Sequence, residues 1–321
     1  MILPSKKINL IKRTVLLLFT CSLVFVPSQN FYATLNLDQH PSFSLSTLPQ
    51  TPVLPYPQNT SRPDPPKLTA NAIMVLDRDS GVPLYSRNEN NRFLPASTVK
   101  IMTFLVAQDY YQSDQVLTVP ELNISGQNNR FYSGEQITVK NLLYGLLVAS
   151  ANDAAFVLST NYPGGEDSFV QKMNQKAQQL HLYRSYFANP AGLDSDSNNK
   201  ILTDYSYTTA FDLARLAKAA LQNPLFAEIV ATKSITITDV SGKIVHPLTN
   251  VNELLGKIPG LKGVKTGYTE EAGECLVTYT ERQNHGIIAV VLGSKDRFGD
   301  SQKLIDWSFS SFTWQTLTPP I

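Results

Sequence analysis

Residues 94–103 constrain the fold and the chemistry of this chain most, because they place a hydroxyl and an amine three residues apart at the start of a predicted helix. Pro95 suits a first helical turn, where its missing N–H leaves no hydrogen bond unmade. Residues 99–106 are apolar on nearly all sides, which predicts a buried helix. Positions i and i+3 share one helix face, so we expect Ser97 and Lys100 to be neighbours.

A lysine in a buried helix has two explanations. The commoner one is a lysine at the helix end that is solvated or paired with an acid. The other is a serine nucleophile whose proton is taken by the neighbouring amine. The 94–103 segment alone favours the first explanation, so the remainder of the chain must decide between them.

Composition excludes several classes of function. The chain has 321 residues, 42% of them hydrophobic, and a net charge of +1, which fits one large domain or two small ones. No basic run occurs beyond the N-terminus, so nucleic acid is not an expected partner. The four histidines stand far apart without acids or cysteines at ligand spacing, and Cys21 and Cys275 are not expected to pair. We therefore expect no metal, no cofactor and no disulfide framework.

The N-terminal region reads as an export segment followed by a spacer. Residues 1–13 hold four basic side chains and no acid, and residues 15–26 are almost entirely apolar. We therefore predict a signal peptide or an N-terminal membrane anchor over 1–33, with both alternatives open, and a location outside the cytoplasm, in the cell envelope. Eight prolines between positions 41 and 66 predict an unfolded linker over 34–67, so the catalytic domain is expected at 68–321.

The folded part predicts an α+β architecture. Period-two and period-3.6 patterns separate cleanly along the chain. Strands are expected at 72–77, 83–86, 234–238, 263–268, 274–282 and 286–293, and helices at 97–106, 138–148, 153–158, 166–182, 208–222 and 300–312. An antiparallel sheet would then be built from both chain ends, with helices on its faces and a helical subdomain inserted between them.

Three short motifs occur in order, and their settings matter more than their letters. They are Ser97-x-x-Lys100 at a helix start, Ser150-x-Asn152 between two helices, and Lys265-Thr266-Gly267 in a strand. A second S-x-x-K at 197–200 lies in a polar loop without a helix to hold its lysine. Active-site serine acyl-transferases require these three motifs in this order and in these settings.

The chemistry required of each motif follows from its side chains. A serine is a weak nucleophile at pH 7 and needs a neutral amine, which burial beside a second lysine would supply. Ser150 is placed to relay a proton to a leaving nitrogen, and Asn152 to hold a substrate amide or Lys100. Lys265 and Thr266 would bind a substrate carboxylate, and Gly267 would let a substrate strand approach.

Several longer segments carry a family resemblance. Residues 189–194, 209–214, 265–269 with 272–273, and 296–298 with Trp307 resemble the D-alanyl-D-alanine carboxypeptidases, which are low-molecular-mass penicillin-binding proteins. The resemblance implies a β-lactamase/transpeptidase-like fold, with an oxyanion hole made by the N–H groups of Ser97 and Tyr268. It also makes Arg297 a candidate for binding the substrate's terminal carboxylate. The alternative is a turn residue paired with Asp296 or Asp300.

The resemblance implies an activity and its partners. We expect removal of the terminal D-alanine from peptidoglycan stem peptides through an acyl-enzyme, and covalent inhibition by β-lactams. A DD-endopeptidase stays open, and a β-lactamase is disfavoured because no Glu-x-x-x-Asn follows Ser150. A silent peptidoglycan-binding domain would not need Lys100. Tyr268 and Ala191 stand where relatives often carry histidine, which bears on substrate preference, and any membrane attachment is expected at the N-terminus.

Overall fold

A computed structural model describes residues 55–61, 64–121, 131–194 and 205–315. The predicted signal or anchor segment, residues 1–33, lies outside these ranges, as does most of the predicted linker. In the described part of the chain, no helix is both long and apolar enough to cross a membrane.

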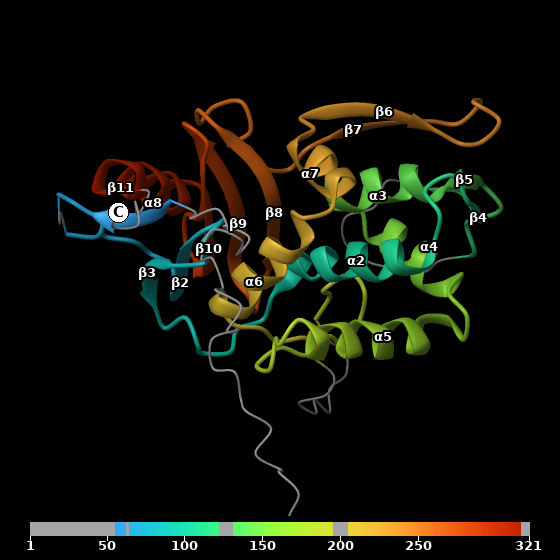
Figure 1. The fold of residues 1–321 in the computed structure, drawn as a ribbon. Helices are drawn as coiled ribbons and strands as arrows, with labels where there is room; N and C mark the ends of the chain where they lie inside the picture. Colours follow the sequence, from blue (N-terminus) through green and yellow to red (C-terminus); the bar gives the residue numbers. More distant parts are fainter. Residues whose placement is uncertain (1–54, 62–63, 122–130, 195–204, 316–321) are drawn as a thin grey trace, which may run out of the picture. The chain divides into compact units, whose positions relative to one another are not determined.

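A five-stranded antiparallel sheet forms the centre of the fold and joins the two ends of the chain (Figure 1). Its strand order is β3-β2-β10-β9-β8. The strands are β2 (Ala72–Asp77), β3 (Pro83–Arg87), β8 (Leu261–Thr269), β9 (Gly273–Arg282) and β10 (His285–Ser294). Both β2 and β10 are nearly buried throughout, as expected of strands covered on two faces. The predicted α+β fold, with its sheet built from both ends, is confirmed.

Helices cover the two faces of this sheet. On one face α8 (Arg297–Ser311) inserts Leu304 and Ile305 among buried residues of β2, β9 and β10. On the other face lie α6 (Ala210–Ala220) and the helical subdomain. That face carries the larger core, to which β10 contributes Ile288 and Val290. The alternation of inward-facing residues along each strand thus supplies two cores with one sheet.

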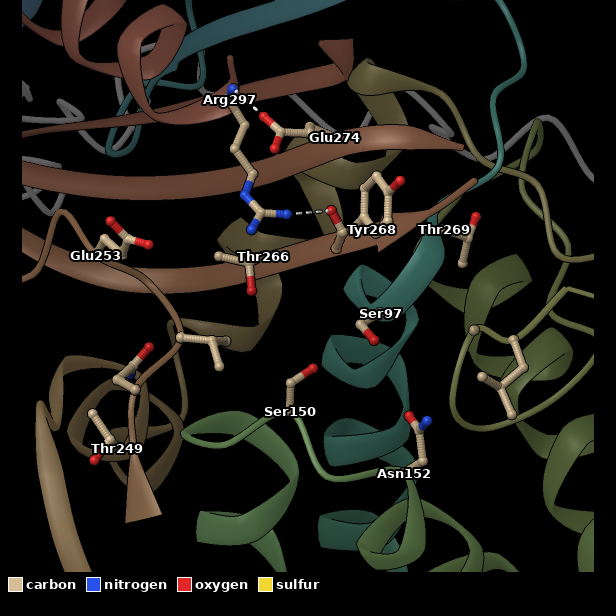
Figure 2. A pocket seen from close by; sticks show the side chains of 15 residues that line it. Ser97, Ser150, Asn152, Thr249, Glu253, Thr266, Tyr268, Thr269, Glu274 and Arg297 are labelled. Atoms are coloured by element: carbon tan, nitrogen blue, oxygen red, sulfur yellow. Dashed lines mark hydrogen bonds between the residues drawn. The ribbon is translucent and has the colours of Figure 1, made fainter. Parts of the chain in front are cut away.

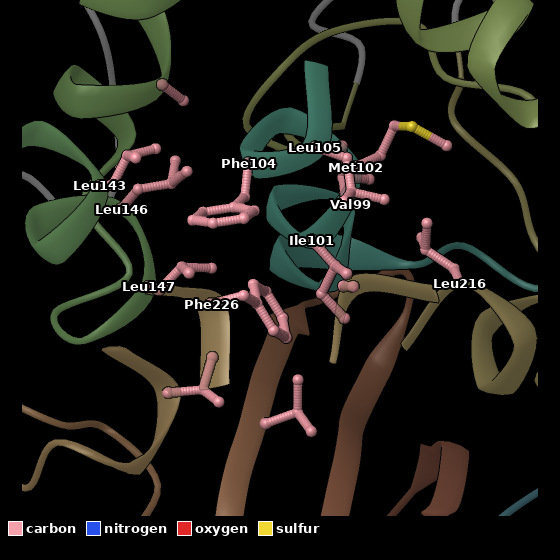
Figure 3. Packing of buried hydrophobic residues seen from close by; sticks show 14 of the residues in the cluster. Val99, Ile101, Met102, Phe104, Leu105, Leu143, Leu146, Leu147, Leu216 and Phe226 are labelled. Atoms are coloured by element: carbon pink, nitrogen blue, oxygen red, sulfur yellow. The ribbon is translucent and has the colours of Figure 1, made fainter. Parts of the chain in front are cut away.

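The helical subdomain surrounds a central helix. Its members are α3 (Val139–Leu147), α4 (Asn152–Thr160) and α5 (Gly165–Gln179), packed around α2 (Lys100–Tyr110). The short 3₁₀ helix η3 (Ala96–Val99) leads directly into α2. Residues 100–107 of α2 are all buried, and Phe104 meets Phe226 edge to face at 4.9 Å (Figure 3). The predicted buried helix is confirmed, with a 3₁₀ first turn.

One helix and some short strands depart from the sequence prediction. No helix is predicted between the helix at 208–222 and the strand at 234–238, yet α7 (Pro224–Ala231) forms there. The Asn223 side chain accepts hydrogen bonds from the N–H groups of Leu225 (2.9 Å) and Phe226 (3.2 Å), and proline occupies the first turn. Two antiparallel strand pairs in the middle of the chain lie outside the main sheet. They pair β4 (Val116–Thr118) with β5 (Gln136–Thr138), and β6 (Ser234–Thr238) with β7 (Val245–Thr249).

A two-stranded sheet ties the start of the described fold to its end. Strand β1 (Tyr56–Asn59) pairs antiparallel with β11 (Phe312–Gln315). The indole Nε1 of Trp314 donates to Asp77 Oδ2 at 2.7 Å, and its ring stacks on His285 at 4.8 Å. Strand β1 lies inside 34–67, so regular structure begins before the predicted boundary at Leu68. Local composition could not show this, because β1 is held by a partner more than 250 residues away.

Candidate active site

The predicted serine and lysine meet at the start of α2. Lys100 is fully buried, and its Nζ lies 2.8 Å from Ser97 Oγ. The same Nζ lies 2.8 Å from Asn152 Oδ1 and 2.8 Å from the carbonyl oxygen of Ala191. The lysine therefore has three oxygen neighbours from the protein and no exposure to solvent, which excludes a solvated lysine at the helix end.

These three neighbours constrain the proton positions. A neutral amine offers two N–H donors and one lone pair. The Ala191 carbonyl and the Asn152 amide oxygen can only accept, so they take the two donors. The hydroxyl of Ser97 is the one neighbour that can donate to the lone pair. Burial lowers the pKa of Lys100 to about 7, against the opposing charge of Asp153, so the neutral amine is populated near neutrality.

A second buried lysine stands beside the second serine. Lys265 Nζ donates to Ser150 Oγ at 2.7 Å and to the Thr266 carbonyl at 2.9 Å. Burial, together with the positive charges of Lys100 and Arg297, lowers the pKa of Lys265 well below its usual range. Ser150 sits between α3 and α4 with φ +58°, a left-handed conformation that is uncommon outside glycine. Such strained residues cluster at functional sites.

Strand β8 lies unusually close to the nucleophile's own backbone. A Cβ at Gly267 would stand 3.0 Å from the Pro95 carbonyl oxygen and 3.2 Å from Ser97 N. A side chain there would require η3 to shift by a few tenths of an ångström, so the glycine allows this close contact. Gly267 is predicted to let a substrate strand approach, and in the structure it also lets η3 approach β8.

The predicted residues converge on one cleft of about 810 Å³ (Figure 2). Its walls come from η3, the α3–α4 break, the turn at 192–193, the end of β7 with the loop after it, β8 and the start of α8. Seven of the predicted residues line it: Ser97, Ser150, Asn152, Thr266, Gly267, Tyr268 and Arg297. The two lysines are buried and reach the cleft through their hydrogen bonds to Ser97 and Ser150. Tyr268 is 60% exposed, in keeping with a role confined to its backbone.

Arg297 begins α8 and faces β8. Its backbone N–H donates to Glu274 Oε2 at 2.8 Å, and its Nη1 donates to the Gly267 carbonyl at 2.9 Å. The two acids considered as alternative partners are used elsewhere: Asp296 accepts from Gly299 N, and Asp300 from Thr69, Ala70 and Ser294. The arginine is thus turned toward the cleft.

A turn that the sequence analysis did not assign to the site holds the third neighbour of Lys100. Asn189 Oδ1 accepts from the N–H groups of Ala191 (3.1 Å), Gly192 (2.7 Å) and Leu193 (3.1 Å). Gly192 has φ +77° and packs directly against the Ala96 carbonyl. This turn fixes the Ala191 carbonyl above Lys100. The sequence contains the segment 189–194 that forms this turn, but that segment was used only as part of the family resemblance and not to predict a site residue.

Comparison of this sequence with models of protein families identifies its family. A model of the D-alanyl-D-alanine carboxypeptidase family matches residues 59–296. The chain belongs to this family. Across the described ranges, no group of three or more His, Cys, Asp or Glu side chains is arranged to hold a metal ion. The carboxypeptidase family and its fold, inferred above from motifs, are confirmed.

Relatives within the carboxypeptidase family cover most of the chain. It is 35% identical to D-alanyl-D-alanine carboxypeptidase DacF of Bacillus subtilis, over 76% of this chain and 63% of the relative. It is 32% identical to DacB2 of Mycobacterium tuberculosis, over 77% and 84%. Less than two thirds of the Bacillus protein is therefore spanned.

Solved structures show the same fold. The Streptomyces K15 DD-transpeptidase is 29% identical, with a TM-score of 0.71 over 77% of this chain and all of that one. Penicillin-binding protein D2 of Listeria monocytogenes, solved with ampicillin bound, is 30% identical, with a TM-score of 0.65 over 75% of this chain and 98% of that one.

Proposed function

We propose that this protein is a serine D-Ala-D-Ala carboxypeptidase that removes the terminal D-alanine from peptidoglycan stem peptides. The observation that carries the proposal is the environment of Lys100 Nζ, 2.8 Å from Ser97 Oγ with acceptors at its other two positions. A buried amine with a pKa of about 7 is a suitable base for a serine nucleophile.

In the acylation step, Ser97 Oγ attacks the carbonyl carbon between the two D-alanines, and its proton passes to Lys100 Nζ. The negative charge that develops on the carbonyl oxygen would be held by the N–H groups of Ser97 and Tyr268. The proton then moves to the leaving nitrogen, with Ser150 as the relay beside Lys265. Free D-alanine departs, and an ester to Ser97 remains.

The remaining predicted residues would hold the substrate. Arg297 supplies positive charge for the terminal carboxylate, and the Lys265 amine and the Thr266 hydroxyl add hydrogen-bond donors. Asn152, whose Oδ1 accepts from Lys100, presents its amide nitrogen to a substrate carbonyl. Water then attacks the ester, Lys100 again takes the proton, and the shortened peptide leaves. β-Lactams would acylate Ser97 in the same way.

We further infer that the protein works in the cell envelope, because its substrate lies outside the cytoplasm. The apolar, basic N-terminus supports export, either as a cleaved signal or as a retained anchor. We also propose an export segment over 1–33, a linker over 34–67 and a catalytic domain over 68–321, except that β1 belongs to the folded domain.

The test is mass spectrometry after incubation with a penicillin. We expect one covalent adduct on the wild type and on Ser197→Ala, which alters the other S-x-x-K serine, and none on Ser97→Ala. Release of D-alanine from diacetyl-lysyl-D-Ala-D-Ala should be lost in the same variant. A wild type without an adduct, or an adduct that survives Ser97→Ala, would refute the proposal. Rapid turnover of penicillin without D-alanine release would indicate a β-lactamase.

A further inference from the structure

The hydrogen bond from Arg297 reaches the peptide unit that carries a proposed oxyanion-hole donor. Its Nη1 lies 2.9 Å from the Gly267 carbonyl oxygen (dashed in Figure 2). That carbonyl and the N–H of Tyr268 belong to the same planar peptide group, in which C=O and N–H point in opposite directions. The guanidinium therefore holds one end of the peptide dipole, and the other end is the Tyr268 N–H.

The guanidinium and the backbone of Arg297 each have a further contact. It lies 4.8 Å from the Phe298 ring centroid, and the backbone N–H of Arg297 donates to Glu274 at 2.8 Å. Its Nε is buried, without a hydrogen-bond partner in the described structure. An anchored cation on a carbonyl oxygen fixes the rotation of the peptide plane. It also draws electron density from the N–H, which makes that N–H a stronger donor.

We propose that Arg297 is a positioning residue for the oxyanion hole, which orients and polarises the Gly267–Tyr268 peptide from behind. This rests on the proposed function and adds to it, because the arginine then assists every acylation at Ser97, including one by a substrate without a carboxylate. If Arg297 only bound the terminal carboxylate, its removal would leave such a substrate unaffected.

Two acyl donors separate these roles. One is diacetyl-lysyl-D-Ala-D-Ala, and the other is the phenyl thioester of diacetyl-lysyl-D-alanine, which acylates Ser97 with loss of thiophenol and carries no terminal carboxylate. For Arg297→Gln we expect kcat to fall about three- to tenfold with both donors, the size expected from weakening one oxyanion donor without removing it. With an isotope-labelled thioester, the infrared band of the acyl-enzyme carbonyl should move to higher wavenumber.

Lys295→Gln is the matched control. It removes a positive charge two residues away, from an exposed side chain, and should change neither rate nor band. Arg297→Lys keeps the charge without the planar fork, so it should fall between wild type and Arg297→Gln. It also serves if the glutamine variant does not fold. A loss confined to the carboxylate-bearing peptide, or an unshifted carbonyl band, would overturn the inference. A wild type that neither donor acylates would instead refute the proposed function.

Discussion

At the scale of single residues, the proton affinity of Lys100 reflects opposing influences. Burial lowers its pKa to about 7, and the negative charge of Asp153 acts in the opposite direction. Asp153 is itself buried, and its carboxylate accepts from the N–H groups of Ala154 (2.8 Å) and Phe131 (3.2 Å). Burial and the positive charges of Lys100 and Arg297 lower the pKa of the neighbouring Lys265. Asp153 therefore offsets part of the effect of burial on the Lys100 pKa.

We predict that Asp153→Asn moves the pH profile of penicillin acylation to lower pH. Only the neutral amine can accept the Ser97 proton, so acylation of the wild type should rise with pH through a midpoint near the Lys100 pKa of about 7. Asparagine keeps an acceptor oxygen but removes the charge that favours the ammonium form. The Lys100 pKa then falls further, and the variant should acylate faster than wild type below the midpoint.

The measurement is the second-order rate constant of acylation by a chromogenic β-lactam, determined at pH values on both sides of this midpoint. Asp167→Asn is the control, because this exposed acid lies in the first turn of α5, away from Lys100, and should leave the profile in place. A profile for Asp153→Asn that coincides with wild type or moves to higher pH would contradict this account.

At the scale of elements, the site depends on two close contacts with η3. Strand β8 approaches through Gly267, and the 189–193 turn approaches through Gly192, which packs on the Ala96 carbonyl. In both contacts the nearest atom is a backbone carbonyl oxygen, which cannot move aside as the end of a flexible side chain can. The position of the Ala191 carbonyl above Lys100 follows from the second contact.

We predict that Gly192→Ala destabilises the protein and impairs acylation together. Its Cβ would overlap the Ala96 carbonyl, and its φ of +77° is unfavourable for alanine. Gly165→Ala is a matched control, with φ +72° and no atom within 4 Å of the new Cβ. We expect the control to lose about 1 kcal/mol of unfolding free energy and Gly192→Ala more than about 2 kcal/mol. Denaturant unfolding and β-lactam acylation measure both effects, and equal losses in the two variants would refute the steric argument.

Some contacts and elements around the site could be predicted from the sequence, and others could not. The pairing of Ser97 with Lys100 was predictable, because helical geometry alone brings positions three apart together. The Ala191 carbonyl was not, because a backbone acceptor leaves no mark on residue type. Helix α7 was missed because its eight residues are too few for a clear period, although Asn223-Pro224 is a recognisable helix start.

At the scale of the whole molecule, strands from both ends of the chain build one sheet, and a second pairing joins the ends again. Strand β8, which carries the Lys265 motif, is at one edge of the main sheet, and β3 is at the other. The β1–β11 pair contacts β2 and β10 through Trp314, which bonds Asp77 and stacks on His285. The long-range partner of β1 was beyond local sequence patterns, whereas β9 and β10 were predicted from the period-two patterns at 274–282 and 286–293.

We predict that β1 contributes to stability and not to catalysis. A truncated protein that begins at Asp64 lacks β1 and leaves β11 without its hydrogen-bonding partner. We expect it to lose about 2 kcal/mol, or about 5 °C in Tm, because four paired residues and the packing around Trp314 are affected. Penicillin acylation at room temperature should be unchanged, since neither β1 nor β11 contributes a residue to the cleft.

A truncated protein that begins at Pro55 is the control for this experiment, because it keeps β1 and removes the residues before it. Its Tm should equal that of the full chain. If the two truncations had the same Tm, the β1–β11 pairing would add nothing to stability. If the Asp64 protein lost acylation while still folded, the ends of the chain would be coupled to the cleft. Acylation that persists alongside a lowered Tm would show that the β1–β11 sheet closes the fold independently of the site, so the linker can vary without altering the chemistry at Ser97.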